Sequence, residues 1–329
     1  MDIELKITKR QVILAVGVSL VSGIFLLAVQ SVLYFNLQYE KSLIEKETLT
    51  KVLGIERKDP FENLALSAKA YLVWDVKEQK IIASFNEEIQ LPLASLAKLM
   101  TTYVVSNNIK EGSILTIQEE NLKKEGDNGL VLGEEWSLSD MIDFVLLSSS
   151  NDGANALASV VSSLNLNQET SVESFIIKMN NTARDLGMAQ SFFLNESGLD
   201  VNEIISGAYG SAKDIVILLE NILKEKPVLL EASIEKEKSI NSNIETHQAE
   251  NTNIIIDKLP GVLASKTGFT DLAGGNLIMA FDIGIGHNII ISVLGSTKED
   301  RFTDVEKLFW ASIGSGFDEN EKTNVGLVY

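Results

Sequence analysis

The sequence predicts an α+β fold in which one antiparallel sheet is built from strands at both ends of a domain. Strand-like apolar runs lie at 71–76, 81–85, 262–267, 275–283 and 287–294. Stretches with helical spacing lie between the two groups, at 96–109, 139–147, 154–162, 174–186 and 211–223, and one more follows at 300–313. Because the two groups of strands flank the helices, we expect one antiparallel sheet backed by a helical subdomain, preceded by one transmembrane helix.

The transmembrane helix is predicted from an apolar segment near the N-terminus. No charged residue occurs from Gln11 to Tyr39, and a helix over 11–35 is long enough to cross a hydrocarbon core about 30 Å thick. The five residues before it include three basic ones, which places residues 1–10 in the cytoplasm and the rest of the chain outside. A cleaved signal peptide is the alternative, but its apolar region is usually about 7–15 residues long. We therefore expect a single-pass protein of the cell membrane that contacts the lipid bilayer through residues 11–35.

The remaining chain divides by composition into three parts. Residues 36–61 mix acidic and basic side chains and reach Pro60, which is typical of a stalk or linker. Residues 62–314 contain every predicted strand and helix of the folded domain, and 315–329 form a C-terminal tail. Within the domain, the polar stretch 235–250 is expected to be a surface excursion.

Charge and residue counts exclude several classes of function. The formal net charge of −18 argues against a nucleic-acid partner, because nucleic-acid phosphates would be repelled. The chain has no cysteine and only two histidines, His247 and His287. Disulfides and thiolate metal sites are thus excluded, and we expect no metal and no cofactor. A Ser-His-Asp triad would have to use one of the two histidines.

Three short motifs follow one another in an order that suits serine acyl transfer. They are Ser95-Leu96-Ala97-Lys98, Ser149-Ser150-Asn151 and Lys266-Thr267-Gly268. Ser-x-x-Lys and Ser-x-Asn also recur elsewhere in the chain, whereas Lys-Thr-Gly occurs once. Each short motif is weak evidence by itself. The order of the three motifs and the local setting of each one select this set from the recurrences.

The first motif pairs a nucleophile with a base. Ser95 and Lys98 are three residues apart, so they share one face of a helix, with Ser95 at its N-terminal edge as a possible cap. A serine hydroxyl needs a base, and a lysine acts as one only when it is neutral. Burial or a neighbouring cation lowers a lysine pKa, and Lys266 could be that cation.

The other two motifs are expected to face the same cleft. Ser149 and Asn151 interrupt a helical stretch, and we expect Asp152 to cap the helix that follows. Lys266 and Thr267 end a strand, where they could meet the negatively charged end of a substrate. Gly268 would open the strand edge so that a peptide can pair alongside it.

These residues resemble the penicillin-recognising serine enzymes, specifically the low-molecular-mass D-alanyl-D-alanine carboxypeptidases of peptidase family S11. The segments that carry the resemblance are 93–101, 146–158, 193–200, 209–214, 251–253 and 266–270. The resemblance covers about 65–313 and implies a β-lactamase/transpeptidase-like fold. It further implies that 62–314 is a DD-peptidase domain.

The resemblance also assigns the catalytic roles. Ser95 would be the acylated nucleophile, Lys98 its proton acceptor, and Ser149 a relay toward the departing D-alanine. The substrate would be a peptidoglycan stem peptide that ends in D-Ala-D-Ala and loses its terminal D-alanine. β-Lactams would be covalent inhibitors.

The resemblance assigns substrate binding to the second and third motifs. Asn151 would hold the substrate amide, and Lys266 and Thr267, beside Gly268, the terminal carboxylate. The oxyanion hole would come from the backbone N–H groups of Ser95 and Phe269.

Three alternatives stay open. A DD-endopeptidase acting on peptidoglycan cross-links would use the same residues. A class A β-lactamase would need a glutamate that positions water, and the nearest match is Glu196-Ser197-Gly198-Leu199-Asp200. A non-catalytic wall-binding protein would be expected to lose a motif residue, and none is lost.

Overall fold

The computed structural model describes residues 59–123, 125–126, 129–163, 172–284 and 286–316, together with 29–30, 33–34, 37–38 and 41. By its internal contacts the chain separates into Met1–Asp59 and Pro60–Tyr329. The predicted membrane segment 11–35 lies outside the described residues except for 29–30 and 33–34, which are helical and exposed. Most of the stalk and the tail beyond 316 also lie outside them. Among the described residues, no helix is both long enough and apolar enough to cross a membrane.

A five-stranded antiparallel sheet forms the centre of the second unit and confirms the predicted pairing of distant segments. Its order is β10-β11-β12-β1-β2. The strands are β1 (Ala70–Asp75), β2 (Lys80–Phe85), β10 (Val262–Thr270), β11 (Gly274–Asp282) and β12 (Asn288–Ser296). The N-terminal hairpin β1–β2 thus adds to a C-terminal meander, and β10 lies at one edge.

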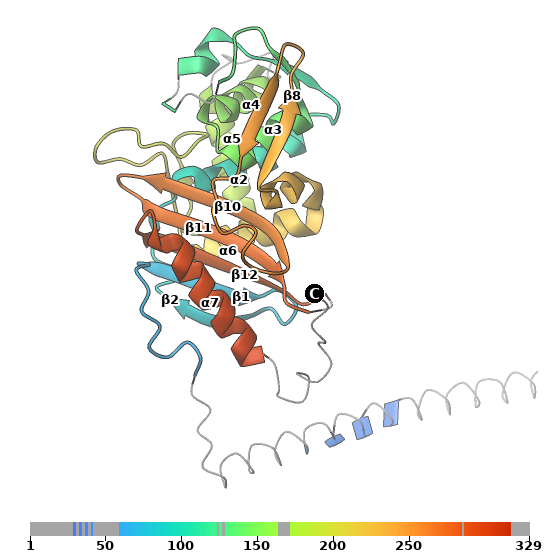
Figure 1. Cartoon of the computed structure of the whole chain (residues 1–329), viewed down its shortest axis with the longest axis vertical. Helices are drawn as coiled ribbons and strands as arrows, with labels where there is room; N and C mark the ends of the chain where they lie inside the picture. Colours follow the sequence, from blue (N-terminus) through green and yellow to red (C-terminus); the bar gives the residue numbers. More distant parts are fainter. Residues whose placement is uncertain are drawn as a thin grey trace, which may run out of the picture. The chain divides into compact units, whose positions relative to one another are not determined.

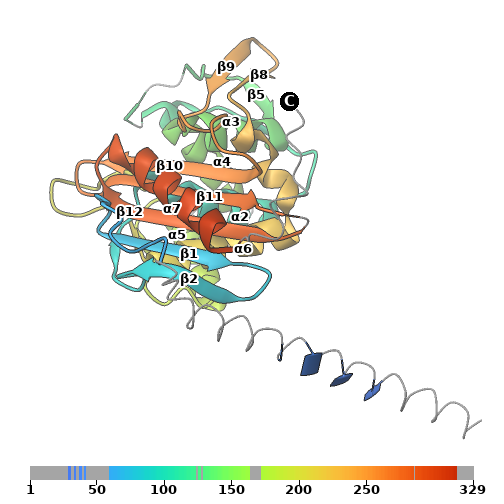
Figure 2. The same cartoon turned by 60° about the horizontal axis from the view of Figure 1, so that its bottom comes forward.

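Both faces of the sheet are covered, which explains why its central strands β11, β12 and β1 are mainly apolar. Helix α7 (Asp300–Gly316) packs on β11 and β12, and α6 (Ala212–Glu225) packs on β1 and β12 from the opposite side (Figures 1 and 2). Alternate side chains therefore enter two cores. Val73, Met279 and Ile291 face α7, whereas Leu72, Ile278 and Ile290 face the helical side.

The helical region lies between the two groups of strands. It comprises η1 (Ala94–Leu96), α2 (Ala97–Asn108), η2 (Glu119–Lys123), α3 (Leu138–Ser148), α4 (Asn151–Ser163), α5 (Val172–Asp185), α6 and η3 (Pro227–Ile234). Short strand pairings join it: β3 (Leu91–Pro92) and β6 (Phe192–Phe193) with β7 (Ala208–Gly210), and β4 (Ile114–Thr116) with β5 (Glu135–Ser137). The predicted helices are confirmed with shifted ends. Ser211 caps α6 by accepting a hydrogen bond from the Asp214 N–H, and Gly187 follows α5 with φ +78°.

The polar stretch 235–250, which we predicted to be a surface excursion, is a β-hairpin whose residues are mostly exposed. Strand β8 (Glu237–Asn241) pairs with β9 (Thr246–Glu250). Ile240, His247 and Ala249 are buried, and the His247 ring lies 4.8 Å from that of Trp136. The inward positions include Lys238 and His247, whose polar side chains conceal this alternation in the sequence.

The core between the sheet and α7 offers a stability test. The Phe309 ring lies 4.4 Å from the ring of Phe281 and is buried. We expect Phe309→Ala to lower the free energy of unfolding by about 3–5 kcal/mol, because it leaves a cavity. Urea denaturation of the full chain measures the change. The matched control is Phe192→Ala, whose ring is 48% exposed and whose loss should cost about 1 kcal/mol or less. Equal losses would show that α7 is not anchored through Phe309.

Candidate active site

Ser95 lies in a tight turn that leads into α2. The preceding Ala94 has φ +48°, a left-handed conformation that is unfavourable for alanine. The Ala94 carbonyl rests against Gly198, where a Cβ would lie only 1.9 Å from its oxygen. The prediction that Ser95 caps α2 was wrong. Leu96 occupies the N-cap position of α2, and its side chain makes no capping hydrogen bond. The Ser95 hydroxyl contacts Lys98 Nζ instead.

Lys98 is fully buried and is held by three oxygen atoms. Its Nζ lies 2.9 Å from Ser95 Oγ and donates to Asn151 Oδ1 at 2.7 Å and to the Ser197 carbonyl at 3.0 Å. Burial lowers the pKa of Lys98 to about 7, since the charged form loses hydration, and the negative charge of Glu196 opposes this change. A fraction of neutral amine is therefore present beside Ser95 near neutral pH.

The second motif forms the joint between α3 and α4. Ser149 ends α3 in a left-handed conformation, with φ +64°. The Ser150 hydroxyl accepts a hydrogen bond from the Gly153 N–H at 3.0 Å, so Ser150 takes the capping role that we predicted for Asp152. The helix begins earlier than predicted, and Asp152 lies in its first turn. Asn151 nevertheless reaches the site, because its Oδ1 accepts from Lys98.

The third motif brings a second buried lysine against the second motif. Lys266 Nζ donates to Ser149 Oγ at 2.9 Å and to the Thr267 carbonyl at 3.0 Å. Burial, together with the positive charges of Lys98 and Arg301, lowers the pKa of Lys266 well below its ordinary value. The Thr267 hydroxyl shares a 2.6 Å hydrogen bond with that of Thr252. The three motifs thus meet in one site.

Gly268 permits the close approach of β10 to the turn that contains Ala94 and Ser95. A Cβ at this position would lie 2.9 Å from the Leu93 carbonyl oxygen and 3.1 Å from the Ser95 nitrogen. The next side chain, Phe269, is 39% exposed, and Lys298 Nζ lies 5.1 Å from the centre of its ring. Gly268 therefore brings the end of β10 next to the backbone of Ser95.

Sequence reasoning did not assign Arg301, Thr252 or Ser197 to the site. Arg301, in the first turn of α7, donates from Nη1 to the Gly268 carbonyl at 2.7 Å. Its burial lowers its pKa to about 10. A buried arginine at the start of a helix has no local signature in a sequence. Thr252 lies within 251–253, one of the segments that resemble the S11 family. That resemblance could have identified Thr252 from the sequence.

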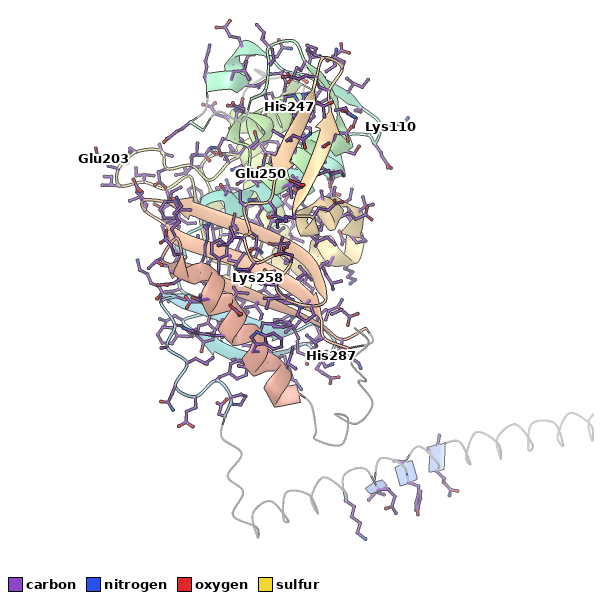
Figure 3. The ribbon with its side chains drawn as sticks, viewed as in Figure 1. Lys110, Glu203, His247, Glu250, Lys258 and His287 are labelled. Atoms are coloured by element: carbon purple, nitrogen blue, oxygen red, sulfur yellow. The ribbon has the colours of Figure 1, made fainter. Side chains whose placement is uncertain are left out.

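The two histidines lie away from Ser95. Figure 3 labels His247 on the β8–β9 hairpin and His287 near the start of β12, at opposite ends of this unit. His247 Nε2 lies 2.7 Å from Glu134 Oε1, and His287 Nε2 lies 3.0 Å from Asp75 Oδ2. Both rings contact carboxylates, whereas the Ser95 hydroxyl contacts Lys98, so the described residues form no Ser-His-Asp triad at Ser95.

One cluster in the described part of the chain has the residue types of a metal site. Ligand atoms of Glu134, Glu245 and His247 lie within 4.8 Å of one another. However, Glu134 Oε2 already accepts from the Val131 N–H and Trp136 Nε1, and Oε1 contacts Ser242 and His247. These hydrogen bonds explain the cluster without a metal: Glu134 is a buried polar group that holds the β8–β9 hairpin in place.

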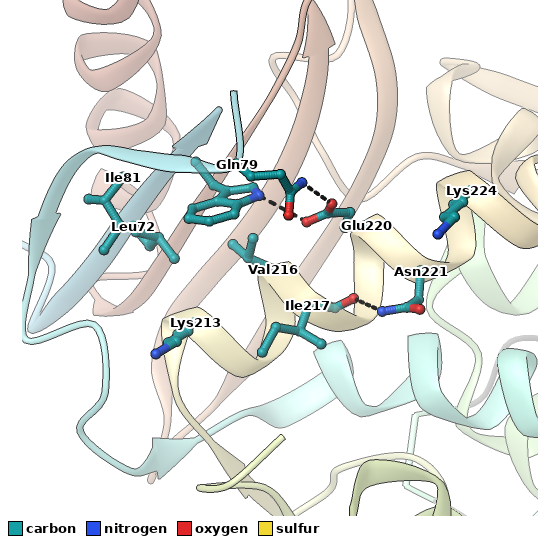
Figure 4. A pocket seen from close by; sticks show the side chains of 10 residues that line it. Leu72, Gln79, Ile81, Lys213, Val216, Ile217, Glu220, Asn221 and Lys224 are labelled. Atoms are coloured by element: carbon teal, nitrogen blue, oxygen red, sulfur yellow. Dashed lines mark hydrogen bonds between the residues drawn. The ribbon is translucent and has the colours of Figure 1, made fainter. Parts of the chain in front are cut away.

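A cavity of about 400 Å³ lies outside the site, between the β1–β2 hairpin and α6 (Figure 4). Its lining includes Leu72, Ile81, Val216 and Ile217. Across it, Glu220 accepts hydrogen bonds from Trp74 Nε1 and Gln79 Nε2. It contains no residue of the three motifs.

A family model described as D-alanyl-D-alanine carboxypeptidase, Peptidase_S11, matches residues 57–298. The chain belongs to this family. Escherichia coli K12 D-alanyl-D-alanine carboxypeptidase DacC is 30% identical over 256 residues, 74% of this chain and 60% of that protein. A D-alanyl-D-alanine endopeptidase of Pseudomonas aeruginosa is 27% identical over 249 residues, 74% of this chain and 76% of that protein.

The comparison with solved structures agrees with the family. Penicillin-binding protein D2 from Listeria monocytogenes, in its ampicillin-bound form, matches with a TM-score of 0.65 and 30% identity, covering 76% of this chain and 98% of that one. This match confirms the predicted transpeptidase-like α+β fold. The chain spans about three fifths of the length of the first curated carboxypeptidases that it matches.

The contact at Gly268 predicts a stability difference between two glycines of this S11 protein. In Gly268→Ala the new Cβ meets the Leu93 carbonyl, a backbone atom that cannot move alone. We expect a cost of about 1–3 kcal/mol and a Tm lower by several degrees in calorimetry. The matched control, Gly284→Ala, places its Cβ where no atom lies within 4 Å and should leave Tm unchanged. Equal Tm values would show that β10 can move away from the turn at little cost.

Proposed function

We propose that this chain is a serine-type D-Ala-D-Ala carboxypeptidase that removes the terminal D-alanine from peptidoglycan stem peptides through an acyl-enzyme on Ser95. The observation that carries the proposal is the 2.9 Å approach of Lys98 Nζ to Ser95 Oγ, in a site where burial lowers the pKa of this lysine to about 7. A base is most effective when its pKa lies near the working pH. Family membership supports the same activity.

In the acylation step, Lys98 takes the proton of Ser95. The freed electron pair of Ser95 Oγ forms a bond to the carbonyl carbon of the penultimate D-alanine, and negative charge develops on the carbonyl oxygen. The backbone N–H groups of Ser95 and Phe269 would stabilise this charge. The close packing of Gly268 on the nucleophile turn supports this pairing of donors.

Collapse of the intermediate releases D-alanine. The C–N bond breaks, and the proton that Lys98 took from Ser95 passes through Ser149 to the leaving amine. The Ser149 hydroxyl lies 2.9 Å from Lys266 Nζ. Asn151 would hold the substrate amide, and Lys266 and Thr267 would bind the terminal carboxylate. The positive charge of Arg301 strengthens the attraction for this carboxylate.

The position of β10 suits a peptide substrate. Because β10 is an edge strand, a peptide in extended conformation can pair along it as a further strand, as in other edge-strand recognition. Water then hydrolyses the Ser95 ester. The products are a stem peptide shortened by one residue and free D-alanine.

β-Lactams are proposed as covalent inhibitors that acylate the same serine. The match to a structure named as an ampicillin-bound penicillin-binding protein supports this. The class A β-lactamase alternative is disfavoured, because the Glu-x-x-Leu-Asn context of its water-positioning glutamate is not matched: Asp200 stands where that context has asparagine. The DD-endopeptidase alternative is supported by one relative of that name.

We also propose the topology indicated by the sequence. Residues 1–10 would lie in the cytoplasm, 11–35 would cross the cell membrane, and 36–61 would form a stalk. The DD-peptidase domain, 62–314, would then act on peptidoglycan outside the membrane, followed by the tail 315–329. The apolar composition of 11–35 and the basic residues before it support this arrangement.

The activity is tested by removing the nucleophile. The wild-type full chain should release D-alanine from a peptide ending in D-Ala-D-Ala, and Ser95→Ala should release none above the uncatalysed rate, because no acyl-enzyme can form. A coupled D-amino-acid oxidase assay measures the product. Mass spectrometry after penicillin treatment should locate the adduct on Ser95. The control Ser106→Ala, in a recurrent Ser-x-Asn of α2, should retain activity, and an adduct on another serine would refute the assignment. Cleavage of cross-linked dimers without release of terminal D-alanine would favour the endopeptidase.

The topology is tested by cell fractionation. The full chain should sediment with membranes and resist extraction by high salt, because residues 11–35 are held by lipid rather than by charge. Protease added to spheroplasts should degrade the 62–314 domain. Recovery of the full chain in the soluble fraction, or protection of the domain from protease, would contradict the proposed topology.

A further inference from the structure

Glu196 is a buried acid that the proposed reaction has not used. It lies in the turn 195–199, which packs against the nucleophile turn through Gly198 and the Ala94 carbonyl. Asn155 Nδ2 donates to Glu196 Oε1 at 2.8 Å. Asn121 Nδ2 in turn donates to Asn155 Oδ1 at 2.9 Å, which fixes the orientation of the Asn155 amide. The carboxylate is therefore held in a defined place.

The same turn is fastened to Lys98 through the backbone. Lys98 Nζ donates to the Ser197 carbonyl at 3.0 Å, and Thr101 Oγ1, one helical turn along α2, donates to the Glu196 carbonyl at 2.6 Å. Asn155 holds the Glu196 side chain from α4. Two helices thus set the position of this acid relative to the base.

The charges around Lys98 come from three elements. The turn 195–199 contributes Glu196, whose negative charge raises the pKa of Lys98 against the effect of burial. Strand β10 contributes Lys266, and α7 contributes Arg301, which lies close enough to act on Lys266. Asp200 is directed elsewhere, because its oxygens accept from Thr270 Oγ1 and the Leu272 N–H.

We infer that Glu196 is a positioning residue whose buried negative charge stabilises the ammonium that Lys98 becomes when it takes the proton of Ser95. The inference rests on the proposed function. In that step the Oγ–H bond of Ser95 breaks, an N–H bond forms on Lys98 Nζ, and the Oγ electron pair bonds to the substrate carbonyl carbon. Without the charge of Glu196, this ammonium would form in buried surroundings that already hold Lys266 and Arg301, where a further cation is unfavourable.

The test is the pH dependence of acylation by a fluorescent penicillin, measured with the full chain in detergent from pH 5 to 9. In the wild type the rate constant should rise with pH through about 7, as Lys98 loses its proton. In Glu196→Gln the pKa of Lys98 falls, so the rising limb should move down by about one pH unit. The plateau should fall by about tenfold, because the ammonium is less stabilised in the transition state. If Glu196 served only to hold the structure, Glu196→Gln would lower the plateau of the acylation rate constant. The pH at which the rate constant rises would then stay unchanged.

Three further variants make the result decisive. Glu196→Asp keeps the charge and should return the limb toward its wild-type position. Thr101→Val loosens the same turn without changing any charge, so its limb should not move. If Glu196→Gln does not fold, as judged by circular dichroism, Asn155→Leu removes the hydrogen bond that holds the carboxylate and should move the limb in the same direction by less. An unmoved limb in folded Glu196→Gln, or in Asn155→Leu where that variant replaces it, overturns the inference. Failure of the wild type to acylate at Ser95 would instead overturn the proposed function.

Discussion

The site depends on the burial of two lysines in one small volume. A charged amine loses its hydration when it is buried, so each lysine needs oxygen acceptors and a route to the neutral form. Lys98 obtains oxygen contacts from Ser95, Asn151 and the Ser197 carbonyl, and Lys266 from Ser149 and the Thr267 carbonyl. These acceptors come from a helix start, a helix joint, a turn and a strand. The packing that brings these four segments together is therefore required for the proposed acyl transfer.

Two residues with a strained backbone lie where these segments meet. Ala94 and Ser149 both adopt left-handed conformations, which cost of order 1–3 kcal/mol each for residues other than glycine. Such conformations persist only where the surroundings leave no alternative. Here Gly198 receives the Ala94 carbonyl, and Arg301 reaches from α7 to the Gly268 carbonyl. The sheet and its two covered faces thus hold the turn at Ala94 and Ser95 and the joint of α3 and α4 in conformations that would not form alone.

Predictions from local pattern succeeded where the signal was local. The β1–β2 hairpin and the strands after Gly261 follow from residues that are neighbours in the chain. The errors arose where a tertiary partner decided the outcome. Ser95 turned toward Lys98 rather than capping a helix, and Ser150 replaced Asp152 as the cap. The 235–250 hairpin was missed because its buried face is recognisable only against Trp136.

The sequence by itself determined the order of the three motifs, the family and the α+β class, because these are carried by residue types at fixed spacings. Only the tertiary structure decided the electrostatics of the site. A sequence shows that Lys98, Lys266, Arg301 and Glu196 exist, but the pKa of a buried group depends on distances and burial. Residues far apart in the chain set those quantities, and they become neighbours only when the sheet and the helices pack together.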